Sequence, residues 1–73
     1  MLYLLLKASI EMITKFLREN QNKTITLAWG LDTFEGVLTF HGRDWWIVSG
    51  QAFHVSQVSS MGMMLSQAYV VVS

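Results

Sequence analysis

The sequence contains no cysteine and no proline, and only 14% of its residues are charged. Without cysteine, no disulfide can stabilise the fold and no thiolate is available as a nucleophile. The lack of cysteine fits a reducing compartment, and we expect a cytoplasmic protein. No linker, internal repeat or low-complexity tract divides the chain. We therefore expect a single domain over residues 1–73.

Apolar residues are abundant for so short a chain. They make up 52% of the 73 residues. A chain of this length buries only about 60% of the surface that it exposes when unfolded, so its stability is marginal without further help. Disulfides are excluded and the sequence contains no set of metal ligands. Oligomerisation is therefore the remaining way to stabilise so small a domain. We predict a homo-oligomer.

The charges balance, with five basic and five acidic residues. A protein that binds duplex DNA by neutralising phosphates is normally clearly basic. Nucleic-acid binding by this chain would therefore depend on stacking and on charge concentrated at one place in an assembly.

The apolar start MLYLLLKASIEM resembles neither a secretory signal nor a membrane span. No basic segment precedes the apolar run, and Lys7 interrupts it. No run approaches the roughly 20 apolar residues that a membrane helix needs. We expect no membrane association.

Residues 2–19 show the spacing of an amphipathic helix. Its apolar stripe recurs every three or four residues: Leu6, Ile10, Ile13 and Leu17. A solvated row of alternating charge recurs every four: Lys7, Glu11, Lys15 and Glu19. We predict that the stripe lies across one end or face of the following β domain.

After this helix the apolar period changes from 3.6 to 2, which is typical of strands. Short turns separate five predicted antiparallel strands, at residues 23–29, 33–41, 45–49, 52–60 and 64–72. In so small a chain this order favours a mainly β fold, a strongly bent five-stranded barrel of the SH3 type after an N-terminal helix. Gly36 is expected to bend the second strand.

Within residues 13–65 a helix is followed by a strand, a turn and a strand with an internal glycine. Along this order stand Trp29-Gly30, Gly36-Val37-Leu38, Asp44, and Met61-Gly62 ahead of Leu65. This pattern resembles the Sm-like family, which includes the Sm and LSm proteins and the bacterial chaperone Hfq. Methionine at 61 stands where the family has arginine.

The resemblance implies that subunits form a ring by pairing the fourth strand of one with the fifth strand of the next. It also implies binding of single-stranded RNA rich in uridine or adenine. In the family a base stacks two residues after the motif aspartate, a position that corresponds to Trp46. The polar residue that reads the base corresponds to Val48, which cannot hydrogen-bond a base through its side chain.

Trp45 and Trp46 are adjacent, so on a strand they point to opposite faces. Trp46 is either a stacking platform or a packing residue, and the sequence leaves both open. Arg43 is suited to contact a phosphate or to stack on a base, unless it lies in a solvated turn. The residues predicted to bind nucleic acid are His41, Arg43, Asp44, Trp45, Trp46, Met61 and Gly62.

The two histidines, His41 and His54, are too few and too widely spaced to indicate a metal site. There is no glycine-rich phosphate loop and no suggestive pair of carboxylates, so we expect neither an enzyme nor a cofactor.

The predicted function is that of an Sm-like ring of about five to eight copies that binds single-stranded RNA, with DNA left open as a ligand, and acts in RNA processing or metabolism. One alternative is a ring that serves as a structural or protein-interaction module without binding RNA. Another is an SH3-like peptide-binding domain with Trp45 or Trp46 in its groove.

Overall fold

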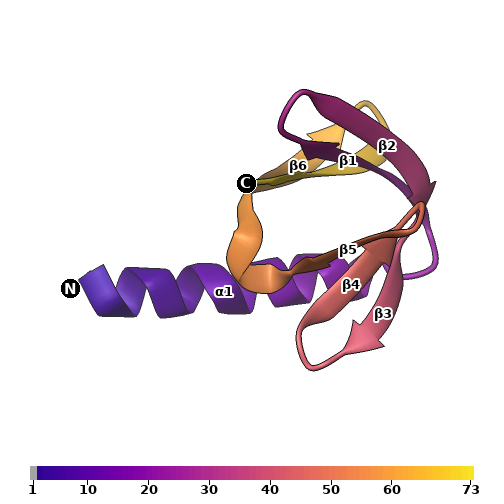
Figure 1. The fold of residues 1–73 in the computed structure, drawn as a ribbon. Coiled ribbons are helices and arrows are strands. Elements are labelled where there is room, and N and C mark those ends of the chain that lie inside the picture. The colour runs from indigo at the N-terminus through magenta and orange to yellow at the C-terminus, as the bar shows by residue number, and fades with distance from the viewer. Residues whose placement is uncertain (1) are drawn as a thin grey trace.

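A computed structural model describes the backbone of residues 2–73 and the side chains from residue 10 onward. Within this part the chain forms one helix and then seven strands in two sheets (Figure 1). The elements are α1 (Leu2–Glu19), β1 (Thr24–Trp29), β2 (Asp32–Val37), β3 (Thr39–Gly42), β4 (Trp45–Val48), β5 (Gln51–His54), the 3-10 helix η1 (Val55–Gln57), β6 (Val58–Met64) and β7 (Gln67–Val72).

The predicted helix is confirmed over its full range, but only part of its apolar stripe is buried. Ile13 and Leu17 belong to the core, whereas Ile10 is 41% exposed. Leu6 lies outside the residues whose side chains are described. Asn20 ends the helix by donating a side-chain hydrogen bond to the Phe16 carbonyl at 2.8 Å, which satisfies a last-turn acceptor. The N-terminal turns of α1 extend beyond the sheets (Figure 1).

The four-stranded sheet has the order β2-β1-β7-β6. Its central pair is parallel, with Thr26 opposite Tyr69, and the other two pairs are antiparallel. The expected fifth strand, residues 64–72, corresponds to β7, which is paired along both edges. Both edges of β7 are therefore occupied within the subunit. The free edges of this sheet belong to β2 and β6.

The three-stranded sheet, β3-β4-β5, is a meander joined by two tight turns. Arg43 and Asp44 form the first turn with φ of 48° and 69°, and Ser49 and Gly50 form the second with φ of 51° and 77°. Positive φ at both central residues is the geometry of type I′ hairpins, whose twist matches that of the strands. A turn between the predicted strands 33–41 and 45–49 is confirmed, but it comprises Arg43 and Asp44, because β3 continues to Gly42.

The prediction of five strands in a barrel is wrong, although a mainly β fold after an N-terminal helix is confirmed. Among the described residues no ladder closes the two sheets into a barrel. The predicted strand 33–41 divides at Leu38, which belongs to neither β2 nor β3. Its N–H donates to the Lys23 carbonyl, and its own carbonyl accepts from the Asn22 N–H, just before β1. The predicted strand 52–60 divides at η1.

Gly36 has a different role from the predicted bend. The break in the strand falls at Leu38, two residues later. A Cβ on Gly36 would lie 3.0 Å from the backbone nitrogen of Ser49, in the turn between β4 and β5. Gly36 therefore allows the four-stranded sheet to approach the three-stranded one closely.

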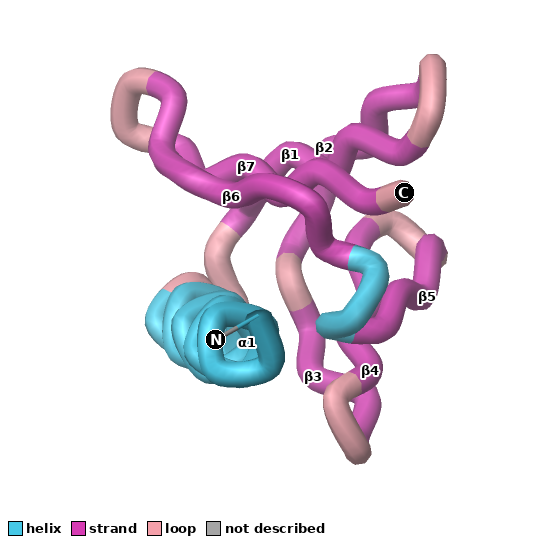
Figure 2. The backbone as a smooth tube through the Cα atoms, turned by 90° about the vertical axis from the view of Figure 1, so that its left-hand side faces the viewer, coloured by secondary structure: helices cyan, strands magenta, loops and turns pink. Residues whose placement is uncertain are grey.

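The core lies between the two sheets, and α1 covers their open side (Figure 2). Helix, both sheets and η1 all contribute buried apolar side chains. They are Ile13, Leu17, Ile25, Leu27, Leu38, Trp46, Val48, Phe53, Val55, Ala68, Val70 and Val72.

Candidate nucleic-acid interface

Trp46 is a core residue and is 1% exposed. Phe40, on the neighbouring strand, packs against its indole edge to face, with ring centroids 5.0 Å apart. The indole nitrogen of Trp46 is buried without a hydrogen-bond partner. Of the two roles that the sequence left open, the structure selects packing, and the prediction of base stacking on Trp46 is wrong.

Trp45 points to the other face of the same sheet and is 41% exposed. It stands opposite His54 of β5. The two rings meet edge to face, with centroids 5.2 Å apart and planes inclined by 74°. Trp45 therefore offers an exposed aromatic surface whose orientation is supported from one side.

The His54 ring is itself fixed by the turn that follows it. Its Nδ1 accepts a hydrogen bond from the backbone N–H of Ser56 at 3.1 Å and lies 2.8 Å from the Ser56 hydroxyl. The backbone N–H of His54 donates to Oε1 of Gln57 at 2.8 Å. This reciprocal capping of η1 positions the ring against Trp45. The sequence analysis did not assign His54 to the site, although the spacing of His54 and Gln57 is that of a capping box.

Polar groups surround Trp45 at the tip of the β3–β4 hairpin. Arg43 and Asp44 are exposed in the turn, and His41 is exposed on the irregular part of β3 beside it. The Asp44 carbonyl accepts from the Val55 N–H at 3.0 Å, which ties the hairpin to the start of η1. The structure thus brings His41, Arg43, Asp44 and Trp45 together on one hairpin.

Met61 and Gly62 lie elsewhere, on β6 of the other sheet. Met61 packs against the core. A Cβ on Gly62 would lie 3.0 to 3.2 Å from atoms of the Tyr69 ring on β7, so the glycine makes room for that ring. Both residues have structural roles within the subunit, and the predicted site divides between the two sheets.

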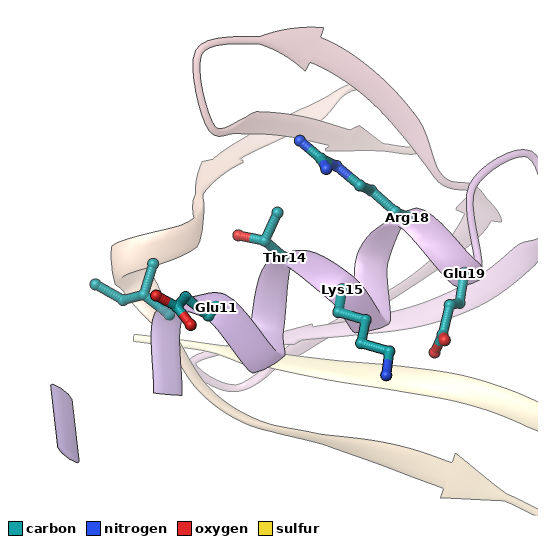
Figure 3. Close-up of a pocket in the computed structure, with 6 residues that line it drawn as sticks. Glu11, Thr14, Lys15, Arg18 and Glu19 are labelled. Carbon is teal, nitrogen blue, oxygen red and sulfur yellow. The ribbon is translucent and has the colours of Figure 1, made fainter. Parts of the chain in front are cut away.

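A hollow of about 480 Å³ runs along α1 and is lined by Ile10, Glu11, Thr14, Lys15, Arg18 and Glu19. Its charged side chains diverge: Lys15 and Glu19 extend to one side of the helix and Arg18 to the other (Figure 3). Because no polar groups converge on a common point, this hollow lacks the arrangement expected of a small-molecule site.

Across the described residues no cluster of three or more metal-ligating side chains is present. In the same part of the chain no helix is long and apolar enough to cross a membrane. Comparison with known proteins finds no match to a family model, to a curated protein or to a solved structure.

Proposed function

We propose that this chain binds single-stranded nucleic acid, RNA in the first place, through the outward face of its three-stranded sheet. The observation that carries the proposal is the exposed indole of Trp45, held edge to face by His54 beside the exposed Arg43. An aromatic platform stacks any base, because every base has a π-face. The cation supplies a contact for the phosphate backbone.

Self-association raises the affinity of this site for nucleic acid. One subunit has no net charge and a single Arg43 beside Asp44, so its attraction for a phosphate chain is weak. Several copies repeat the Trp45 and Arg43 pair and focus positive potential locally. The Sm-like resemblance supports RNA as the ligand, an assembly of several copies and a cytoplasmic role in RNA processing or metabolism. The proposal itself requires only that more than one copy comes together.

A second candidate is a structural or protein-interaction module that binds no nucleic acid. The observation that favours this second candidate is the structural role of three predicted site residues. Trp46, Met61 and Gly62 are all used in packing within the subunit, so two of the positions that the resemblance assigns to the RNA pocket do not face a ligand.

The proposal is tested by fluorescence anisotropy of labelled oligo-uridine and oligo-adenine RNA. Trp45→Ala should weaken binding by about 1–3 kcal/mol per engaged base, with the salt dependence unchanged. Trp45→Phe keeps a stacking surface and should restore much of that affinity. Leu31→Ala, at the exposed tip of the β1–β2 hairpin, is the matched control and should bind like the parent.

Arg43→Ala separates the electrostatic contribution from stacking. Its binding should weaken, and the slope of log K against log salt should fall by about 1 for each phosphate that the variant no longer binds. Lys15→Ala removes one positive charge from the exposed side of α1 and should leave the slope unchanged. A parent protein that binds no single-stranded RNA at low salt would replace this proposal by the second candidate.

A further inference from the structure

β6 is an unprotected sheet edge. At seven residues it is the longest strand, and it ends the four-stranded sheet. Native proteins usually protect such edges with charges or proline. Residues 45–73 contain no lysine, arginine, aspartate, glutamate or proline. The opposite edge, β2, differs because it carries Asp32 and Glu35.

An apolar groove runs beside this edge. A cavity of about 160 Å³ separates α1 from β6, and its lining residues are Met12, Ile13, Val58, Ser59, Ser60 and Met61. Met12 is 62% exposed although it faces this space. Lys15, Phe16 and Glu19 continue the hollow along the helix past Met61. The groove therefore combines free backbone groups on one wall with apolar side chains on the other.

The hairpin formed by β6 and β7 carries an exposed side chain, that of Met63, which fits such a groove. Met63 is 55% exposed and pairs with Ala68, while Met61 pairs with Val70. Residues two apart on a strand share a face, so Met63 points to the same side as Met61 and the core. Met64 and Leu65 follow at the tip and are 68% and 98% exposed. Methionine is unbranched and fills irregular apolar gaps well.

We propose that two copies of this chain join by antiparallel pairing of β6 with β6 about a two-fold axis. Met61 of each copy then stands opposite Met63 of the other, over the groove lined by Met12. Each copy supplies one inserted methionine and one groove, so a single symmetric contact covers both. β6 itself brings no charge into the contact, because residues 45–73 contain no lysine, arginine, aspartate or glutamate.

The remaining free edges match β6 less well. β3 and β5 are four residues long, and on β5 Phe53 is buried in its own core while His54 caps η1. The exposed apolar residue of β5 is the small Ala52, which cannot fill the groove as a head-to-tail contact with β6 would require. The inference concerns assembly and stands independently of nucleic-acid binding.

The test is sedimentation velocity of the intact chain over a micromolar concentration series. The parent should sediment as a dimer. Met63→Glu places a carboxylate in the proposed contact and should raise the dimer dissociation constant by roughly 100-fold or more. Leu31→Glu makes the same exchange at another exposed hairpin tip, where the leucine is fully exposed, and should sediment like the parent.

Cysteine cross-linking tests the register and does not depend on a charged variant. The chain has no cysteine of its own, so Met61→Cys and Met63→Cys each introduce one thiol. Mixed and oxidised, the two variants should form the mixed dimer in large excess over either homodimer. A Leu31→Cys variant in place of Met63→Cys measures random collision.

Three results overturn the inference: a parent that stays monomeric at tens of micromolar, a closed ring of more than two copies, or mixed cross-linking no greater than with Leu31→Cys. A monomeric parent would also remove the self-association that the nucleic-acid proposal requires. The other two results overturn only the β6 contact and leave the comparison of Trp45→Ala with the parent unaffected, so the two proposals can fail separately.

Discussion

The two sheets differ in what holds them together. The four-stranded sheet has longer strands and three ladders, and its inner face carries aliphatic side chains such as Leu27 and Val70. The three-stranded sheet has strands of four residues joined by I′ turns, and its inner face depends on two large aromatic side chains, Trp46 and Phe53. Short strands contribute few cross-strand pairs, so each side chain carries a larger share of the stability.

The outer faces differ in the same way. On the four-stranded sheet, Gln67 donates to both Thr26 and Glu35, at 3.0 and 2.9 Å, in a polar network that links three strands. On the three-stranded sheet, the exposed Trp45 rests on His54. The small sheet therefore combines a core residue and a binding surface in adjacent positions, and mutation can separate these two roles.

The largest expected effect comes from Trp46→Ala. Removing a buried aromatic side chain from a core costs about 3–5 kcal/mol, a large fraction of the total stability of a chain this short. The unfolding free energy from urea denaturation followed by circular dichroism measures this destabilisation.

Trp45→Ala is the matched control and should change the unfolding free energy by less than about 1.5 kcal/mol, mainly through its contact with His54. Equal destabilisation of the two variants would contradict the assignment of one tryptophan to the core and the other to the surface.

Gly36→Ala tests the contact between the sheets and should have the next largest effect. The new methyl group would meet the Ser49 backbone at 3.0 Å, which cannot move as a side chain can. We expect a destabilisation of about 1–3 kcal/mol. Gly62→Ala meets only the Tyr69 side chain and should cost less, because that ring can shift. Thermal unfolding measures the loss of stability in each variant. A larger loss for Gly62→Ala than for Gly36→Ala would contradict this prediction.

His54→Ala should have the smallest effect on stability. It removes the acceptor that caps η1 and should cost about 1 kcal/mol. His54→Asn restores a capping oxygen but not the aromatic ring, and should recover stability without recovering nucleic-acid affinity. Recovery of both by asparagine would show that the ring does not support Trp45.

Local patterns in the sequence predicted the helix over residues 2–19, a turn just before Trp45 and a mainly β fold. The division at Leu38 was not predictable from periodicity, because Leu38 is buried and the alternation of apolar residues continues across the break. The same limit applies to the tryptophan pair. Alternation places them on opposite faces, but only the packing partners decide which face is inside.

Contacts distant in sequence account for the other differences. The predicted strands leave residues 61–63 between them, yet β6 continues through Gly62, which pairs with Tyr69 of β7. The actual turn contains Leu65 at φ 59°, and leucine is not a residue that marks positive φ in a sequence. Pairing of β7 with β1 likewise depends on tertiary structure.

That pairing has a consequence for the order of folding. β7 follows every other described strand along the chain, and in the sheet it lies between β1 and β6. Thr26 of β1 pairs with Tyr69 of β7, which follows it by more than half of the chain. β1 therefore gains its second neighbouring strand late. Contacts so distant along the chain slow folding, because the entropy of loop closure must be given up before they form. During synthesis, until residues 67–72 emerge, one edge of β1 remains without its hydrogen-bonding neighbour.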